Sequence, residues 1–94
     1  MTDRFRKGLR RLAPEDNERI STLLQELQGE VTQEPEAAIP KLFMEAIVEE
    51  VELGGKVHRV HRLRVGNYRL FYALMSEQEL LVFLDVRHRR GAYD

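Results

Sequence analysis

The chain has no cysteine and no long apolar run among its 94 residues. The lack of cysteine excludes disulfides and thiolate chemistry. No stretch approaches the roughly 18 apolar residues that a membrane span requires, and the basic N-terminus has no apolar core typical of a secretory signal. These absences predict a single domain that works in the cytoplasm without a membrane partner.

The net charge of −1 conceals a strong segregation of charge along the chain. Residues 1–13 carry a net charge of +4, residues 14–55 of −9, and residues 56–94 of +4. Charge blocks of opposite sign favour different partners. The basic C-terminal third is a candidate for binding phosphates, whereas the acidic middle is typical of a solvated helix face.

Apolar spacing in the N-terminal third predicts a helical hairpin over residues 3–12 and 14–28. Pro14 is suited to open the second helix, and Gly29 is a candidate stop. In the first helix, the basic side chains are expected to turn outward. Residues 29–39 are predicted to form a polar loop.

Residues 40–53 allow two interpretations. Pro40 could open a third helix through about Glu50, which is the interpretation that we favour. Alternatively, residues 47–53, Gly54-Gly55 and residues 56–65 could form a hairpin with a two-residue glycine turn, placing Glu50 opposite Arg59.

Three further runs predict strands over residues 56–65, 68–74 and 79–86, the first two joined at Gly66-Asn67. The last two are apolar on both faces and are expected to be central strands. The fold class is therefore α+β, with an N-terminal helical hairpin packed on a small antiparallel β-sheet. We expect one domain over 1–94, divided into the helical hairpin (1–28), a variable insert (29–55) and a β-meander with a basic site (56–94).

Basic residues flank the two apolar runs of the C-terminal third. Antiparallel pairing would bring these clusters together and create a surface suited to phosphate. Metal binding is not expected, because His58 and His61 are three apart on one strand and so point to opposite faces. Tyr68 and Tyr72 favour packing over base stacking.

The string Arg62-Leu63-Arg64-Val65-Gly66-Asn67-Tyr68-Arg69-Leu70-Phe71-Tyr72, followed by Val86-Arg87-His88-Arg89-Arg90-Gly91-Ala92-Tyr93, resembles the RelE/ParE toxin superfamily. Residues 3–28 fit the helical hairpin of that family. The family usually begins with a β-strand, which here is missing or replaced by residues 47–53.

The resemblance implies a toxin of a type II toxin–antitoxin pair with a microbial-ribonuclease-like fold. RelE-type members cut ribosome-bound mRNA without a metal or cofactor, through attack of the ribose 2′-hydroxyl on the adjacent phosphate. ParE-type members poison DNA gyrase instead. The endoribonuclease is our leading expectation; the alternatives are a non-catalytic gyrase inhibitor and an antitoxin-binding relic.

The resemblance also assigns roles to individual residues. Arg69 matches an arginine that contacts the scissile phosphate, and Arg89 one that stabilises the transition state. Tyr93 matches a tyrosine that acts on the 2′-hydroxyl, and His88 stands where some members use histidine. The expected phosphate-binding residues are Arg62, Arg64 and Arg90.

These roles agree with the chemistry of phosphoryl transfer, which requires fixed positive charge and a proton acceptor. Histidine exchanges protons near neutral pH, whereas tyrosine, with a pKa of about 10 in solution, needs nearby cations to act as a base. The expected partners are ribosome and mRNA, and an antitoxin encoded by the adjacent gene. The antitoxin would engage the basic face with an acidic helix, or an exposed sheet edge with an added strand.

Overall fold

The computed structural model describes residues 1–88, apart from the side chain of Ser76. Helices come first and strands follow, as the sequence predicts. The elements are α1 (Asp3–Arg10), α2 (Pro14–Gln33), α3 (Pro35–Phe43), β1 (Ala46–Leu53), β2 (Lys56–Val65), β3 (Tyr68–Met75), the short 3-10 helix η1 (Ser76–Gln78) and β4 (Leu80–His88). Within residues 1–88, no helix combines the length and apolar character needed to cross a membrane.

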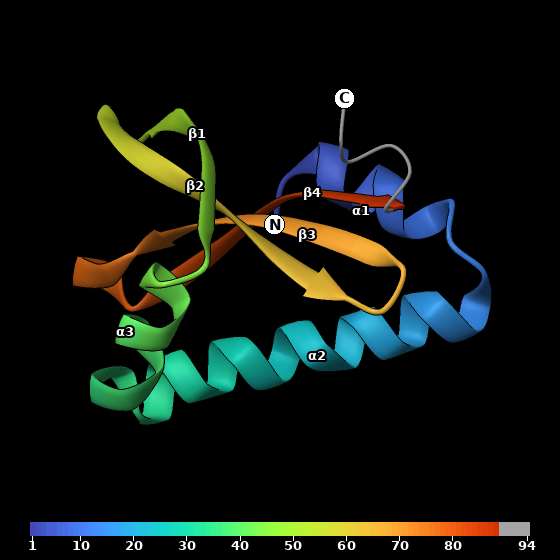
Figure 1. The fold of residues 1–94 in the computed structure, drawn as a ribbon, viewed down its shortest axis with the longest axis horizontal. Helices are drawn as coiled ribbons and strands as arrows, with labels where there is room; N and C mark the ends of the chain where they lie inside the picture. Colours follow the sequence, from blue (N-terminus) through green and yellow to red (C-terminus); the bar gives the residue numbers. More distant parts are fainter. Residues whose placement is uncertain (89–94) are drawn as a thin grey trace.

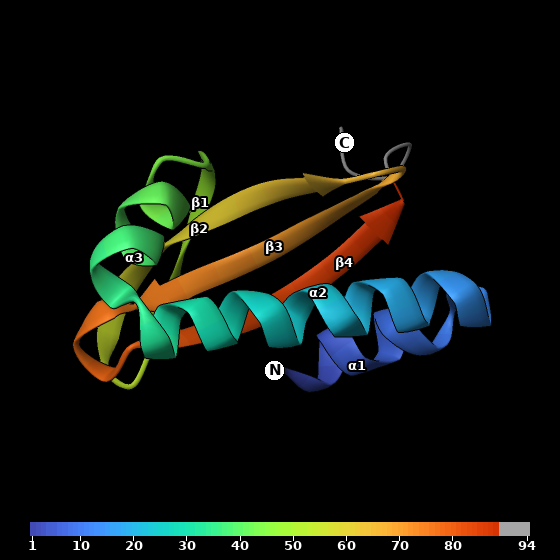
Figure 2. The ribbon, with the colours of Figure 1, turned by 90° about the horizontal axis from the view of Figure 1, so that it is seen from below.

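The four strands form one antiparallel meander in the order β1-β2-β3-β4. Helices α1 and α2 lie against one face of this sheet, and α3 packs near the end where β1 begins (Figures 1 and 2). The core lies between these layers and is formed by apolar side chains of all three helices and of β3 and β4. The α+β class is therefore confirmed.

Helix α1 is fixed to strand β4 at both of its ends. Thr2 caps the helix by accepting the Phe5 N–H at 3.2 Å, while its hydroxyl donates to the Leu84 carbonyl at 2.9 Å. The Thr2 N–H donates to the Phe83 carbonyl at 3.0 Å. Further along, a Cβ built on Gly8 would lie 2.7 Å from Val86 Cγ1, so only glycine permits this close approach.

Helix α2 continues to Gln33, so the predicted stop at Gly29 and the predicted loop over residues 29–39 are wrong. The reason is that the apolar stripe continues past Gly29 to Val31, which is fully buried. Burying a valine contributes about 1.5–3 kcal/mol, which exceeds the roughly 1 kcal/mol cost of a glycine inside a helix. Gln28 adds two hydrogen bonds where the chain enters β4. Its Nε2 donates to the Glu79 carbonyl, and its Oε1 accepts from the Leu81 N–H.

The favoured helix over residues 40–50 is also wrong, and the alternative hairpin is observed. Helix α3 begins at Pro35, includes Pro40 and ends at Phe43. Strand β1 then pairs with β2 across Gly54 and Gly55, whose φ values of 58° and 80° suit a two-residue hairpin turn. Glu50 stands opposite Arg59, as that alternative predicted.

The positions of the strands correct a further expectation. Strand β3 is central and almost entirely buried, as predicted, but β4 is an outer strand of the sheet. Its apolar side chains meet α1 and α2 on one face. Among residues 1–88 no strand precedes α1, and residues 46–53 form the outer strand beside β2.

Candidate functional site

Three arginines stand side by side across the face of the sheet that α1 and α2 leave uncovered. The strand register pairs Arg64 of β2 with Arg69 of β3, and Arg69 with Arg87 of β4. The next row is Arg62, Phe71 and Asp85. Residues that pair directly across strands share a face, so β2, β3 and β4 place four guanidinium groups on one surface.

The four arginines differ in how far they can reach a ligand. Arg64 is exposed, whereas Arg69 is only 6% exposed, and its Nη1 donates to the Tyr68 carbonyl at 3.0 Å. The Nε of Arg62 is buried and has no hydrogen-bond partner within residues 1–88. Arg69 thus braces the sheet in this structure, while Arg64 is open to solvent.

A cavity of about 720 Å³ lies where α1 meets the end of β4. Four cations line it: two from α1, one from the residue that caps its C-terminus and one from β4. A histidine and one carboxylate complete the lining. Its lining residues are Arg4, Lys7, Gly8, Arg11, Leu12, Tyr68, Asp85, Val86, Arg87 and His88. We call this space the cationic cavity; its excess of positive charge suits an anionic ligand.

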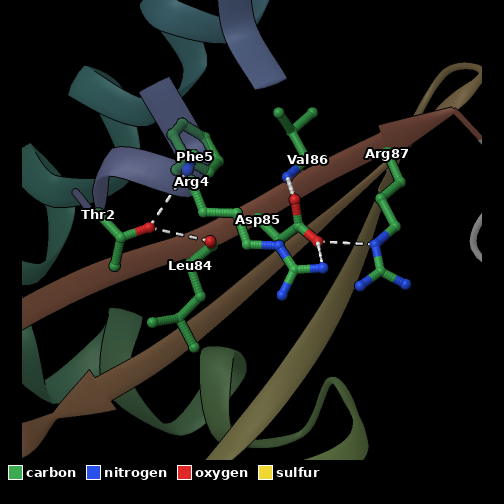
Figure 3. Close-up of polar contacts among 7 residues, drawn as sticks. All are labelled: Thr2, Arg4, Phe5, Leu84, Asp85, Val86 and Arg87. Carbon is green, nitrogen blue, oxygen red and sulfur yellow. Dashed lines mark hydrogen bonds and ion pairs between the residues drawn. The ribbon is translucent and has the colours of Figure 1, made fainter. Parts of the chain in front are cut away.

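Asp85 organises one side of the cationic cavity (Figure 3). Its Oδ2 accepts from Arg87 Nε at 2.6 Å and lies 3.4 Å from Arg4 Nη2, and its Oδ1 accepts from the Val86 N–H. The Arg87 guanidinium also lies 5.2 Å from the centre of the Phe71 ring. One carboxylate therefore holds two cations that come from opposite ends of the chain.

His88 lies at the far end of β4, on the side of the sheet opposite to the arginine row. It pairs in register with Tyr68, and the two rings meet edge to face at 5.6 Å. The Tyr68 hydroxyl donates to Asp16 Oδ2 at 2.8 Å, and this hydrogen bond, with minor contributions from burial and the negative charge of Asp16, raises the tyrosine pKa. Tyr68 is therefore a neutral hydrogen-bond donor that fixes α2 to β3.

The structure thus divides the residues that the sequence singled out. It brings His88 into the cationic cavity with Arg87, and it leaves Arg62, Arg64 and Arg69 outside the cavity lining. Arg89, Arg90 and Tyr93 lie outside the described residues.

The sequence interpretation missed the contribution of α1 to this cavity. Arg4, Lys7 and Arg11 were expected only to turn outward. Their spacing of three and four residues, which places side chains on one helix face, was the available signal. What the spacing could not reveal is that this face borders β4, about 80 residues further along the chain.

The two remaining histidines take separate positions in the sheet. His61 is buried, its Nδ1 lies 3.1 Å from the Glu45 carbonyl, and its ring stacks on Tyr72. His58 borders a different cavity, near the turn of the β1–β2 hairpin. Within residues 1–88, no group of three His, Cys, Asp or Glu side chains is arranged to hold a metal ion.

The helices-then-meander architecture defines a small α+β protein consistent with the RelE/ParE fold. Residues 1–93 match the family described as the ParE toxin of the type II toxin–antitoxin system parDE. The chain belongs to this family, so it is a toxin of a type II toxin–antitoxin system, and membership implies a cognate antitoxin as its partner. No individual curated protein and no solved structure gives a significant match.

Proposed function

We propose that this toxin is a metal-independent endoribonuclease that cuts ribosome-bound mRNA in the cytoplasm. The observation that supports the proposal is the cationic cavity, whose lining includes His88, Arg87 and three cations at α1 and its C-cap. A histidine beside fixed positive charge is what attack of a 2′-hydroxyl on the neighbouring phosphate requires.

In the proposed reaction, His88 accepts the proton of the ribose 2′-hydroxyl as its oxygen attacks the adjacent phosphorus. The bond from phosphorus to the 5′-oxygen of the next nucleotide breaks, leaving a 2′,3′-cyclic phosphate and a 5′-hydroxyl, whose proton comes from water. Arg87, with Arg4 and Arg11, faces the negative charge that grows on the phosphoryl oxygens. Neither a metal ion nor a cofactor takes part in these steps.

The remaining candidates keep the roles that the family resemblance implies. Arg89 directly follows His88 in sequence and is proposed to stabilise the transition state, with Arg90 beside it on phosphate and Tyr93 on the 2′-hydroxyl. Arg64 is exposed on the open face and is proposed to hold a flanking phosphate, with Arg62 as its neighbour. Arg69 is proposed to act from a buried position, through the sheet rather than as a freely mobile phosphate ligand.

A second candidate is a non-catalytic toxin that inhibits gyrase. One observation favours it: Arg62, Arg64 and Arg69, with Arg87 in the same row, lie on the opposite side of the sheet from His88. These arginines are therefore not on the same face of the sheet as the histidine that would accept the proton.

Induced expression in a bacterial host, with transcript ends mapped before growth stops, separates the two candidates. We expect cuts inside translated codons for the natural chain and none for His88→Ala. His58→Ala is the matched control, since His58 lies outside the cationic cavity and should leave cleavage intact. Growth arrest with intact transcripts and damaged DNA would reject the ribonuclease in favour of gyrase inhibition.

A further inference from the structure

The ring of Tyr68 is the neighbour of His88 across the strands. His88 is exposed at the end of β4 and stands in register with Tyr68, the first residue of β3. The two rings meet edge to face at 86°, with their centres 5.6 Å apart, and both side chains line the cationic cavity. An exposed histidine at a strand end can otherwise sample several rotamers, so this contact restricts where the imidazole lies.

Tyr68 is itself held in place at three points. Its ring packs against the hydrophobic core, its hydroxyl donates to Asp16 Oδ2 at 2.8 Å, and its carbonyl accepts from Arg69 Nη1 at 3.0 Å. The hydrogen bond to Asp16 raises the pKa of Tyr68 above the ordinary value of 10.0, with smaller contributions from burial and from the charge of Asp16. The phenol therefore keeps its proton at neutral pH and remains the donor. Tyr68 is a fixed surface beside an exposed histidine.

Asp16 provides the far end of this arrangement. It lies in the first turn of α2, where the helix dipole stabilises a negative charge. Three elements are thus linked in sequence: the start of α2 through Asp16, the start of β3 through Tyr68, and the end of β4 through His88. The order of the links runs from a long packed helix towards the exposed ring in the cavity.

We propose that Tyr68 is a positioning residue, which together with Asp16 holds the His88 ring in the cationic cavity. This inference rests on the proposed ribonuclease and extends it from the reacting group to the residues that orient that group. A proton acceptor acts only within hydrogen-bonding distance of the hydroxyl that it deprotonates. A displacement of about 1 Å can cost roughly a hundredfold in rate. Tyr68 itself takes up no proton in the reaction.

The first test is the side-chain conformation of His88 in the free, full-length toxin, measured from three-bond couplings by NMR. The natural toxin should show one χ1 rotamer. Tyr68→Leu, which keeps apolar bulk but removes the aromatic ring, should show averaged couplings. Averaged couplings already in the natural toxin, or a single rotamer in Tyr68→Leu, would overturn the proposal.

Cleavage kinetics on ribosomes carrying mRNA provide the second test. Tyr68→Leu should lower kcat roughly tenfold or more and change KM by less than about twofold, because the cations that bind phosphate stay in place. Tyr68→Phe, which keeps the ring and loses only the bond to Asp16, should lose less. Tyr72→Phe is the matched control: it also removes a tyrosine hydrogen bond, to the Leu42 carbonyl at 2.7 Å, but at a buried site outside the cationic cavity. Equal losses of kcat in Tyr68→Phe and Tyr72→Phe would contradict positioning.

Asp16 allows a rescue experiment on the same link. Asp16→Ala removes the acceptor of the Tyr68 hydroxyl and should resemble Tyr68→Phe in kcat. Asp16→Asn keeps an oxygen that can accept from the phenol, so it should recover most of the loss. Equal losses in the two Asp16 variants would contradict positioning through this hydrogen bond.

Failure of this inference and failure of the proposed function give different results. Natural toxin that cuts no transcript, with His88 averaged only in Tyr68→Leu, would reject the ribonuclease and leave the restraint of His88 by Tyr68 standing. Natural toxin that cuts transcripts, with Tyr68→Leu at the natural kcat, would keep the ribonuclease and overturn this inference.

Discussion

The two outer strands of the sheet are covered very differently. On the face of β4 that α1 packs against, Phe5 and Val86 are buried, and the cations of the helix crowd the same edge. Within residues 1–88, no helix lies along the outer side of strand β1; most of its residues are exposed, and three of its eight residues are glutamates. One edge is therefore built for internal packing beside a positively charged cavity, and the other is left open beside negative charge.

The largest expected effect is on stability at the β4 edge. Phe5 is fully buried, and its ring centre lies 5.5 Å from that of Phe83. Phe5→Ala should lower the free energy of unfolding by about 3–5 kcal/mol through lost burial and a new cavity. Val57→Ala in the β1–β2 hairpin, at a side chain 63% exposed, should change it by less than about 0.5 kcal/mol. Urea unfolding of both variants measures the difference, and similar losses would contradict the contrast between the edges.

Two helical glycines should respond to alanine in opposite directions, because only Gly8 packs against β4. Gly8→Ala places a methyl group 2.7 Å from Val86 Cγ1 and 3.2 Å from the Val86 carbonyl oxygen, so we expect a loss of about 1–3 kcal/mol. Gly29→Ala meets nothing within 4 Å inside α2 and should gain up to about 1 kcal/mol. Thermal unfolding of the two variants measures these changes in stability. A neutral Gly8→Ala would show that α1 shifts freely on β4.

Local signals predicted the strands better than the segment between the helices and the sheet. Runs rich in aromatic and branched residues, with the Gly66-Asn67 turn between them, were enough to predict β2 and β3. Between residues 29 and 50, Gly29 and Pro40 suggested the wrong boundaries. Burial of Val31 under the sheet and docking of α3, where the Tyr72 hydroxyl donates to the Leu42 carbonyl at 2.7 Å, override those local preferences.

The candidate site was only partly predictable for a similar reason. His88 and the neighbouring arginines share one stretch of sequence, so their clustering could be inferred from strand pairing. Arg4 and Asp85 are far apart in the chain, and their contact depends on how α1 crosses β4. No periodicity in either segment encodes that crossing.

A substitution at Asp85 tests how charge at the β4 edge affects stability and RNA binding. Its expected effect on stability is smaller than that of Phe5→Ala. Asp85→Asn keeps the shape but removes the charge that holds Arg4 and Arg87, so we expect a loss of stability of about 1 kcal/mol. Binding of a short, non-cleavable RNA should tighten severalfold, because a competing carboxylate leaves the cationic cavity. Fluorescence anisotropy at two salt concentrations checks this, with Glu26→Gln on α2 as the control for net charge. Weaker RNA binding by Asp85→Asn would mean that the carboxylate positions the two arginines rather than competing with the ligand.

The smallest predicted effect on stability lies at the end of the sheet where the β1–β2 turn approaches the β3–β4 connection. The two segments are joined there by the Lys56–Glu77 ion pair at 3.8 Å. Glu79 there has a φ of 50°, a left-handed backbone that costs a non-glycine residue energy. Glu79→Gly should therefore stabilise the fold by roughly 0.5 kcal/mol, even though glycine also loosens the unfolded chain. Gln78→Gly, one position earlier in η1 and without a positive φ, should instead destabilise it by a similar amount, as urea midpoints would show. If both variants lost stability equally, the conformation of Glu79 would carry no strain, and the open end of the sheet would be as relaxed as the packed one.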